Sequence, residues 1–427
     1  MKFFKIFFSI AVLAAITSSC RKDMPVYNRP NDYLRGDAAS AFESFWTGMN
    51  SNYIFWGVDP TDWDAVYDIY QPKFARLDID EEEDIVKLYE YLSDITKDLV
   101  DGHYSIKFND DIRDFLINAG YNPNIIPSDS RHIKNGTYRN GIVLSQYIFK
   151  QLPHKYLSDT LRGLAIVDDN PLYMLLGSVN NTAGKDICYF YLSGFAITGY
   201  LNKPNDYGAP GHAPIDVILE ALASALASPS LDGVIIDLRG NGGGYTDDLN
   251  ILWGSLLTGK PFVAGYNRHK IGEGRLDYGP KVPVVIRPNA ELNNNFNIPT
   301  NPHPVTAPIV VLADVNSVSC AEISTMALSH LPNGYFVGET TWGGQGVLLN
   351  NDNALIIHSG GTFNNFLMKL VYTPYRSFEC VNGNSYEGKG FSPKDAPRGY
   401  EVKHNAAAIA AGDDPQLEKA IEIIINR

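Results

Sequence analysis

A glycine-rich turn is the first segment of this sequence that could do chemistry. Residues 237–244 read DLRGNGGG and overlap the end of a short apolar run at 233–238. Glycines leave backbone N–H groups uncovered, so such a turn can approach a ligand closely. It lacks the Lys of a P-loop, and Tyr245 stands where a dinucleotide-binding motif needs its last Gly. An oxyanion hole built from the N–H of Gly242 or Gly243 remains as the functional interpretation, beside a plain turn.

A serine follows a second apolar run in a similar way. Residues 316–323 read NSVSCAEI and join the run at 308–313 to a helical pattern. Ser319 would lie at the helix N-terminus, where free N–H groups, including that of Cys320, favour an oxyanion. The spacing Ser319-x-x-Glu322 also matches a capping box, so a purely structural role stays open.

A serine nucleophile needs a base, and the base needs an orienting acid. The segment VDGHYS at 100–105 holds His103, and SYEGKGFSP at 385–393 holds Glu387. Taken alone, the first is an ordinary junction histidine and the second an ordinary surface turn. By residue type, His103 is one of nine histidines that could serve as the base, and Glu387 could orient a base.

Alternating strands and helices are expected to position these segments. From about residue 185 the pattern predicts strands at 187–192, 233–238, 308–313, 335–337, 355–358 and 369–373, and helices at 215–227, 249–257, 320–330 and 416–425. Such alternation predicts an α/β core with parallel strand pairing over residues 185–427.

Two further regions precede this core. Residues 38–107 carry apolar side chains at helical spacing and predict a helical domain; the clearest stripe is Ile85, Leu88, Leu92, Ile95 and Leu99. Residues 108–184 hold short β-like runs at 141–144 and 173–176, which predict a mostly β insertion.

The N-terminus reads as a targeting segment. Residues 1–19 have a short basic start, an apolar stretch and small residues before Cys20. The pattern resembles a bacterial lipoprotein signal, which implies lipidation of Cys20, although Thr17 replaces the usual Leu. An ordinary secretory signal is the alternative. Residues 20–37 would form a tether, and we expect a lipoprotein of the cell envelope, facing the periplasm or the cell surface and held at the outer membrane.

Composition excludes several classes of function. The chain has 35 Lys and Arg against 48 Asp and Glu, a net charge of −13, so it is a poor candidate for binding nucleic acid. Besides Cys20 there are only Cys188, Cys320 and Cys380, which permit at most one disulfide. Cysteine and histidine do not occur at zinc-binding spacing, so we expect no metal site.

Together these segments resemble one serine peptidase family, that of the tail-specific (C-terminal-processing) proteases, the tricorn protease core and the retinol-binding-protein repeats. The matching segments are GVIIDLRGNGGG, NSVSCAEI, DGHYS, EGKGFSPKD, DICYFYLSGF at 186–195 and VGETTWGGQG at 337–346. The resemblance implies a ClpP/crotonase-like α/β core and a peptidase that acts on peptides or proteins without a cofactor.

One departure from the family decides the mechanism. Processing proteases carry their general base, a Lys, where this chain has Gly344. The resemblance therefore points to the tricorn-like branch, with His103 as base and Glu387 as orienting acid, although Gly102 replaces that branch's Ser. Lys389 is the alternative base.

Two non-catalytic interpretations stay open. Loss of the Lys leaves room for a peptide-binding lipoprotein on the same fold. A glycan-binding surface protein would rest on the 25 Tyr and 5 Trp. Those aromatics fall mostly at helical or strand spacing, so core packing accounts for them better.

Overall fold

The computed structural model describes residues 36–136, 141–202, 211–289, 298–348 and 361–427. The targeting segment with Cys20 and the strand expected at 355–358 lie outside these residues. Within them, no helix is both long and apolar enough to cross a membrane.

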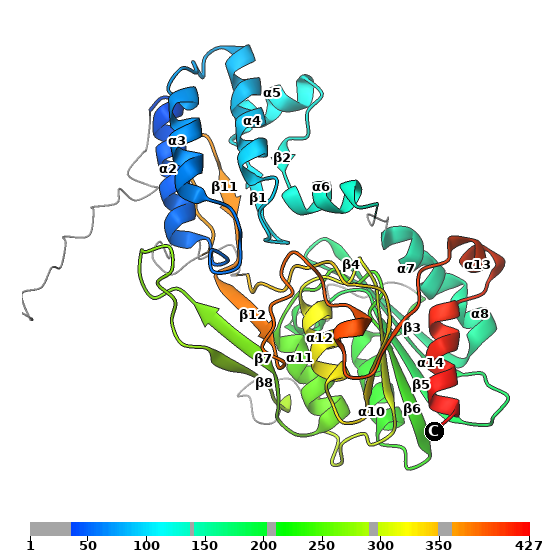
Figure 1. Cartoon of the computed structure of the whole chain (residues 1–427). Coiled ribbons are helices and arrows are strands. Elements are labelled where there is room, and N and C mark those ends of the chain that lie inside the picture. The colour runs from blue at the N-terminus through cyan, green and yellow to red at the C-terminus, as the bar shows by residue number, and fades with distance from the viewer. Residues whose placement is uncertain (1–35, 137–140, 203–210, 290–297, 349–360) are drawn as a thin grey trace, which may run out of the picture.

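A seven-stranded sheet forms the centre of the molecule (Figure 1). Its order is β13 (Gly399–Glu401), β10 (Gly334–Gly338), β9 (Ile309–Ala313), β6 (Leu231–Asp237), β5 (Asp186–Leu192), β4 (Asn170–Val179) and β3 (Leu157–Val167). The strands from β13 to β5 pair in parallel, and β4 and β3 add an antiparallel hairpin at one edge. The predicted α/β core with parallel pairing is confirmed.

The central strands are apolar on both faces because helices cover both sides. In β6, Val234 and Ile236 face one core cluster, whereas Ile235 faces another. The first face carries α10 (Ile215–Leu226), α12 (Cys320–Ser329) and a π-helix (Asn250–Thr258) that continues α11 (Asp247–Leu249). The second carries α7 (Gly141–Lys150), α8 (Leu152–Tyr156) and α14 (Pro415–Ile425). The helices expected at 215–227, 249–257, 320–330 and 416–425 are thus confirmed.

The region 108–184 holds helices as well as strands. It contains α5 (Asp110–Asn118), β2 (Asn124–Ile125), α6 (Pro127–Lys134), α7, α8 and the β3–β4 hairpin. The strand expected at 141–144 is wrong, because these residues begin α7. Leu144, Tyr147 and Ile148 are buried at helical spacing against the sheet, and this packing overrides the local β preference. The strand expected at 173–176 is confirmed within β4.

The N-terminal region is helical, as predicted, and adds a small sheet. Helices α2 (Ala38–Asn52), α3 (Trp63–Phe74) and α4 (Glu82–Thr96) share a core with residues from a distant part of the chain, among them Phe363 and Val371. The strand expected at 369–373 exists as β11 (Leu370–Tyr372), but it pairs with β1 (Ser105–Lys107) and not with the main sheet (Figure 1).

A third, antiparallel sheet has the order β12 (Arg376–Cys380), β7 (Phe262–His269) and β8 (Val282–Ile286). Residues 97–104 link α4 to β1 and bring the base candidate His103 from the N-terminal region toward the carboxyl ends of the parallel strands. The site therefore combines two parts of the fold.

Candidate active site

Ser319 stands between β9 and α12 in an unusual backbone conformation. Its φ is +57° and its ψ −118°, whereas a residue that merely caps a helix adopts extended angles. The backbone N–H of Ser319 donates to the carbonyl oxygen of Gly344 at 2.9 Å and to Glu322 Oε2 at 3.2 Å. Non-glycine residues held at positive φ cluster at functional sites, where surrounding contacts maintain the strain.

The glycine-rich turn packs directly on this serine. Asn241 organises it: its Nδ2 donates to the carbonyl of Leu192 at 2.7 Å, and its Oδ1 accepts from Gly243 N at 2.8 Å. Gly243 has a φ of +87°, and a Cβ placed there would lie 2.6 Å from Ser319 Cβ. Only glycine fits at this position without displacing the serine.

Two backbone donors near Ser319 stay available. Within the described residues, the N–H groups of Gly242 and Cys320 donate no hydrogen bond, whereas that of Gly243 is taken by Asn241. Gly242 and Cys320 line a cavity of about 520 Å³ together with Ser319 and His103. Unpaired N–H groups at such a place can stabilise an oxyanion.

The side chain of Cys320 takes no part in this chemistry. Burial raises the pKa of its thiol to about 12, and the thiol donates to the carbonyl of Gly244 at 3.2 Å. Cys188, Cys320 and Cys380 are all buried free cysteines.

His103 presents a neutral imidazole to the cavity. Its ring Nδ1 is buried and has no hydrogen-bond partner in the part of the chain that the structure describes. Burial lowers the pKa of His103 to about 4, so the ring is unprotonated at neutral pH and can accept a proton. Lys389, the alternative base, is exposed and does not line the cavity.

Two glycines allow the segment that carries His103 to pack against the loop at 341–346. A Cβ on Gly344 would lie 3.3 Å from His103 Cε1, so the imidazole lies beside the position of the family's lysine. A Cβ on Gly102 would lie only 2.3 Å from the carbonyl oxygen of Gly343. The serine of the tricorn-like branch would not fit at position 102 beside this loop.

Glu387 is buried and holds backbone groups on both sides of the site. Its Oε1 accepts from Gly102 N at 2.9 Å, and its Oε2 accepts from Gln345 N at 2.9 Å and Gly346 N at 3.0 Å. Among the described residues no hydrogen bond joins Glu387 to the ring of His103. Burial, and next the charge of Asp101, raise the pKa of Glu387 well above its usual range.

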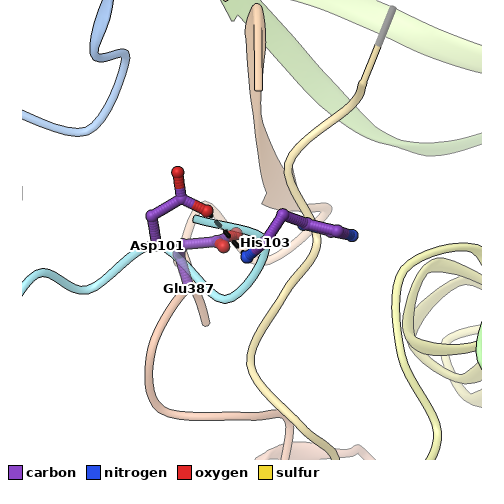
Figure 2. Close-up of side chains that lie close together, drawn as sticks. All are labelled: Asp101, His103 and Glu387. Atoms are coloured by element: carbon purple, nitrogen blue, oxygen red, sulfur yellow. Dashed lines mark hydrogen bonds between the residues drawn. The ribbon is translucent and has the colours of Figure 1, made fainter. Parts of the chain in front are cut away.

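Asp101 is a third member of this cluster, to which the sequence pattern assigned no role. Its Oδ1 accepts from the backbone N–H of His103 at 2.8 Å, and its Oδ2 accepts from Thr373 Oγ1 at 2.8 Å. Burial raises the pKa of Asp101 to about 7. Figure 2 shows both carboxyl groups near the backbone N–H of His103, with the ring extending away from them. The only signal in the sequence was its place two residues before the histidine.

Asp101, His103 and Glu387 have side chains of the kinds that bind divalent cations. Their potential ligand atoms lie within 4.8 Å of one another. Each of the four carboxylate oxygens already accepts a hydrogen bond, however, so a cation would have to compete with these bonds.

Glu322 organises the loop at 341–346 against the serine. Its Oε1 accepts from Thr341 Oγ1 at 2.6 Å, Gly343 N at 2.8 Å and Gln345 Nε2 at 2.8 Å, and its Oε2 accepts from Gly344 N at 2.7 Å. The sequence indicated only half of this role, the bond to the backbone of Ser319. Glu322 therefore fixes the loop whose Gly344 carbonyl accepts from the backbone N–H of Ser319.

A buried ion network holds the glycine-rich turn to the C-terminal helix. Arg239 donates to both oxygens of Asp237 at 2.9 and 2.6 Å and to both oxygens of Asp414 at 2.9 and 2.8 Å. Asp414 caps α14 through the N–H of Leu417. Paired bidentate contacts of this kind offset the cost of burying the charges.

A strained serine, an imidazole that is unprotonated at neutral pH and free backbone donors thus meet at one cavity. The family model of peptidase family S41 matches residues 207–380. No curated protein sequence matches the chain. The match to the family model covers the segment that holds the glycine-rich turn and Ser319, and it indicates a serine peptidase.

Solved structures of low sequence identity share the fold. A protein from Parabacteroides merdae ATCC 43184, solved as a candidate peptidase, is 18% identical, with a TM-score of 0.60 over 91% of this chain and 97% of its own. Mature CPAF is 13% identical, with a TM-score of 0.56 over 91% of this chain and 98% of its own.

Proposed function

We propose that this peptidase uses Ser319 as nucleophile and His103 as general base. One observation carries the proposal: both side chains line the same cavity as the free N–H groups of Gly242 and Cys320. A neutral, partly buried imidazole and two preorganised donors beside a serine are the groups that acyl transfer requires.

The steps follow from these positions. Ser319 Oγ attacks the carbonyl carbon of the scissile peptide bond while His103 accepts the hydroxyl proton. The N–H groups of Gly242 and Cys320 donate to the oxyanion, and Gly243 leaves room for Ser319. His103 then protonates the leaving amine as the C–N bond breaks. Water, deprotonated by His103, hydrolyses the acyl-enzyme and releases the second product.

Glu387 would act on the imidazole through the backbone. It holds Gly102, the neighbour of His103, and the loop residues Gln345 and Gly346 with one carboxyl group. The match to a peptidase family supports peptides or proteins as substrates, and among the residues that the structure describes no Asp, Glu, Lys or Arg lines the cavity.

Replacing Glu387 by Gln tests this assignment. Both carboxylate oxygens accept backbone N–H groups, so an amide NH₂ would have to face a donor, which costs about 1–3 kcal/mol. We expect kcat for hydrolysis of an unstructured protein to fall about tenfold to a hundredfold, because small displacements of a catalytic group have effects of this size.

The exposed neighbour Lys389 is the matched control. Lys389→Ala should keep kcat within about twofold of the wild type, since its side chain does not reach the cavity. If Lys389→Ala removes activity and Glu387→Gln does not, the histidine-based assignment is wrong.

We also propose that the mature chain is a lipoprotein of the cell envelope, anchored through Cys20. The support is the short apolar stretch and small residues that precede this cysteine. Replacing Cys20 by Ser should move the protein to the soluble fraction or leave the signal uncut. Membrane fractionation and the mass of the mature N-terminus measure this, and an unchanged distribution without a lipid mass would reject the anchor.

A further inference from the structure

Trp342 contacts the segment that precedes Ser319, the segment that carries His103, and a helix of the N-terminal region. Its backbone N–H donates to the carbonyl of Ser317 at 3.1 Å, two residues before the nucleophile. Its indole Nε1–H donates to the carbonyl of Gly102 at 3.3 Å, next to the base. His132 on α6 stacks on the indole with ring centroids 3.8 Å apart, and its Nε2 lies 2.9 Å from the carbonyl oxygen of Trp342. That carbonyl can only accept, so Nε2 carries the proton.

These contacts matter because the ring Nδ1 of His103 has no hydrogen-bond partner among the described residues. Its position depends on the backbone that carries it. The peptide groups of Gly102 are held at both ends, with the N–H on Glu387 and the carbonyl on Trp342. The Gly102 Cα is also packed against Gly343 and Gly344, where a Cβ would not fit.

We propose that Trp342 is a positioning residue that sets the place of His103 relative to Ser319, and that His132 on α6 holds Trp342 in that role. The proposal rests on the proposed function of His103. The proposal gives α6, which lies outside the α/β core, a part in catalysis. We call the chain of contacts from His132 on α6 through Trp342 to Gly102 the strap; it connects the N-terminal region to the segment that carries Ser319.

Trp342→Phe tests the strap, because it keeps an aromatic ring for His132 to stack on and removes the bond to Gly102. We expect kcat and the rate of Ser319 labelling by a fluorophosphonate each to fall about tenfold to a hundredfold, while KM stays within about twofold. Trp46→Phe is the matched control: Trp46 Nε1 also donates to a backbone carbonyl, that of Trp63 at 2.8 Å, within the N-terminal helices. This control should leave kcat and the labelling rate unchanged.

A second variant guards against simple misfolding. His132→Phe keeps the stack and removes the bond to the carbonyl of Trp342, and we expect a smaller loss in kcat, about threefold to tenfold. Because both substitutions act through one strap, their effects should be less than additive in the double variant. Thermal unfolding of each variant shows whether a loss follows stability instead.

The outcomes separate this proposal from the function on which it rests. If His103→Ala labels as fast as the wild type, the proposed base is wrong. If His103→Ala is inactive but Trp342→Phe matches Trp46→Phe in kcat and labelling rate, the base is right and the strap is overturned. A change in KM alone, or fully additive losses, would also overturn it.

Discussion

Replacing Ser319 by Ala is expected to abolish both peptide hydrolysis and covalent labelling by a fluorophosphonate, which the wild type should show at Ser319. His103→Ala should lower both rates by about 10⁴- to 10⁶-fold, because members of a catalytic triad act as a unit. The physical reason lies in the site: a serine hydroxyl is a weak nucleophile until a neighbouring base takes its proton. Mass spectrometry of the labelled peptide and single-turnover rates measure these effects.

The pH dependence of labelling gives this prediction a second signature. Burial lowers the pKa of His103 to about 4, compared with about 6.5 for an exposed histidine. Protonation of His103 removes the base. The labelling rate should therefore stay constant as the pH is lowered from neutral, and it should fall only near the pKa of His103 in the folded protein, about pH 4. An acidic limb at about pH 6.5 would show that the imidazole is solvated in the active state.

Three results would contradict the assignment. Labelling at a residue other than Ser319 would show that Ser319 is not the nucleophile. If labelling is normal in a variant without His103 but absent in a variant without Lys389, Ser319 is the nucleophile and Lys389, not His103, is the base. Resistance of the wild type to the probe, with bound peptides recovered intact, would favour a peptide-binding protein on the same fold.

Gly243→Ala is expected to have the next largest effect. The new Cβ would meet Ser319 Cβ at 2.6 Å, the carbonyl oxygen of Val318 at 2.9 Å and Cys320 N at 3.1 Å. Real Cβ atoms do not approach backbone this closely, so the serine and its neighbouring donor must shift. We expect kcat to fall about a hundredfold or more. Alanine at positive φ adds about 1–2 kcal/mol of strain, and overpacking adds about 1–3 kcal/mol.

Gly412→Ala separates the effect of backbone strain from the effect of the contact between residue 243 and Ser319. Gly412 has the same φ of +87°, but a Cβ there meets no atom of the described residues within 4 Å. Its stability should fall by about 1–2 kcal/mol from the strain, with kcat unchanged. Steady-state kinetics and chemical unfolding on both variants measure the two effects. Equal losses of kcat in the two variants would mean that the contact of Gly243 with Ser319 does not matter.

The sequence alone determined the local parts of the site. A buried strand followed by a glycine-rich turn, and a buried strand followed by a serine and a helix, are recognisable within windows of about ten residues, because burial and helix initiation leave periodic patterns. The structure has both as expected: β6 precedes the turn with Gly242 and Gly243, and β9 precedes Ser319 and α12. The residue types Ser, His and Glu suggested the chemistry.

Other local expectations failed where distant packing decides. Ile142 and Val143 have β-branched side chains, yet residues 141–144 begin α7 because the helix buries its apolar face on the main sheet. The strand at 369–373 was recognisable as a strand, but no local signal shows that its partner is β1 of the N-terminal region.

Only the tertiary structure decided how the groups of the site act on one another. Glu387 is predicted to orient the imidazole, and its carboxyl group accepts from the backbone N–H of Gly102, the neighbour of His103, 285 residues away in the chain. Asp101 is tied to Thr373 across 272 residues, and the serine φ of +57° results from contacts with the 341–346 loop and the glycine-rich turn together. A sequence window records which side chains a segment offers. Which backbone groups they meet depends on contacts between segments far apart in the chain, and those contacts exist only in the folded chain.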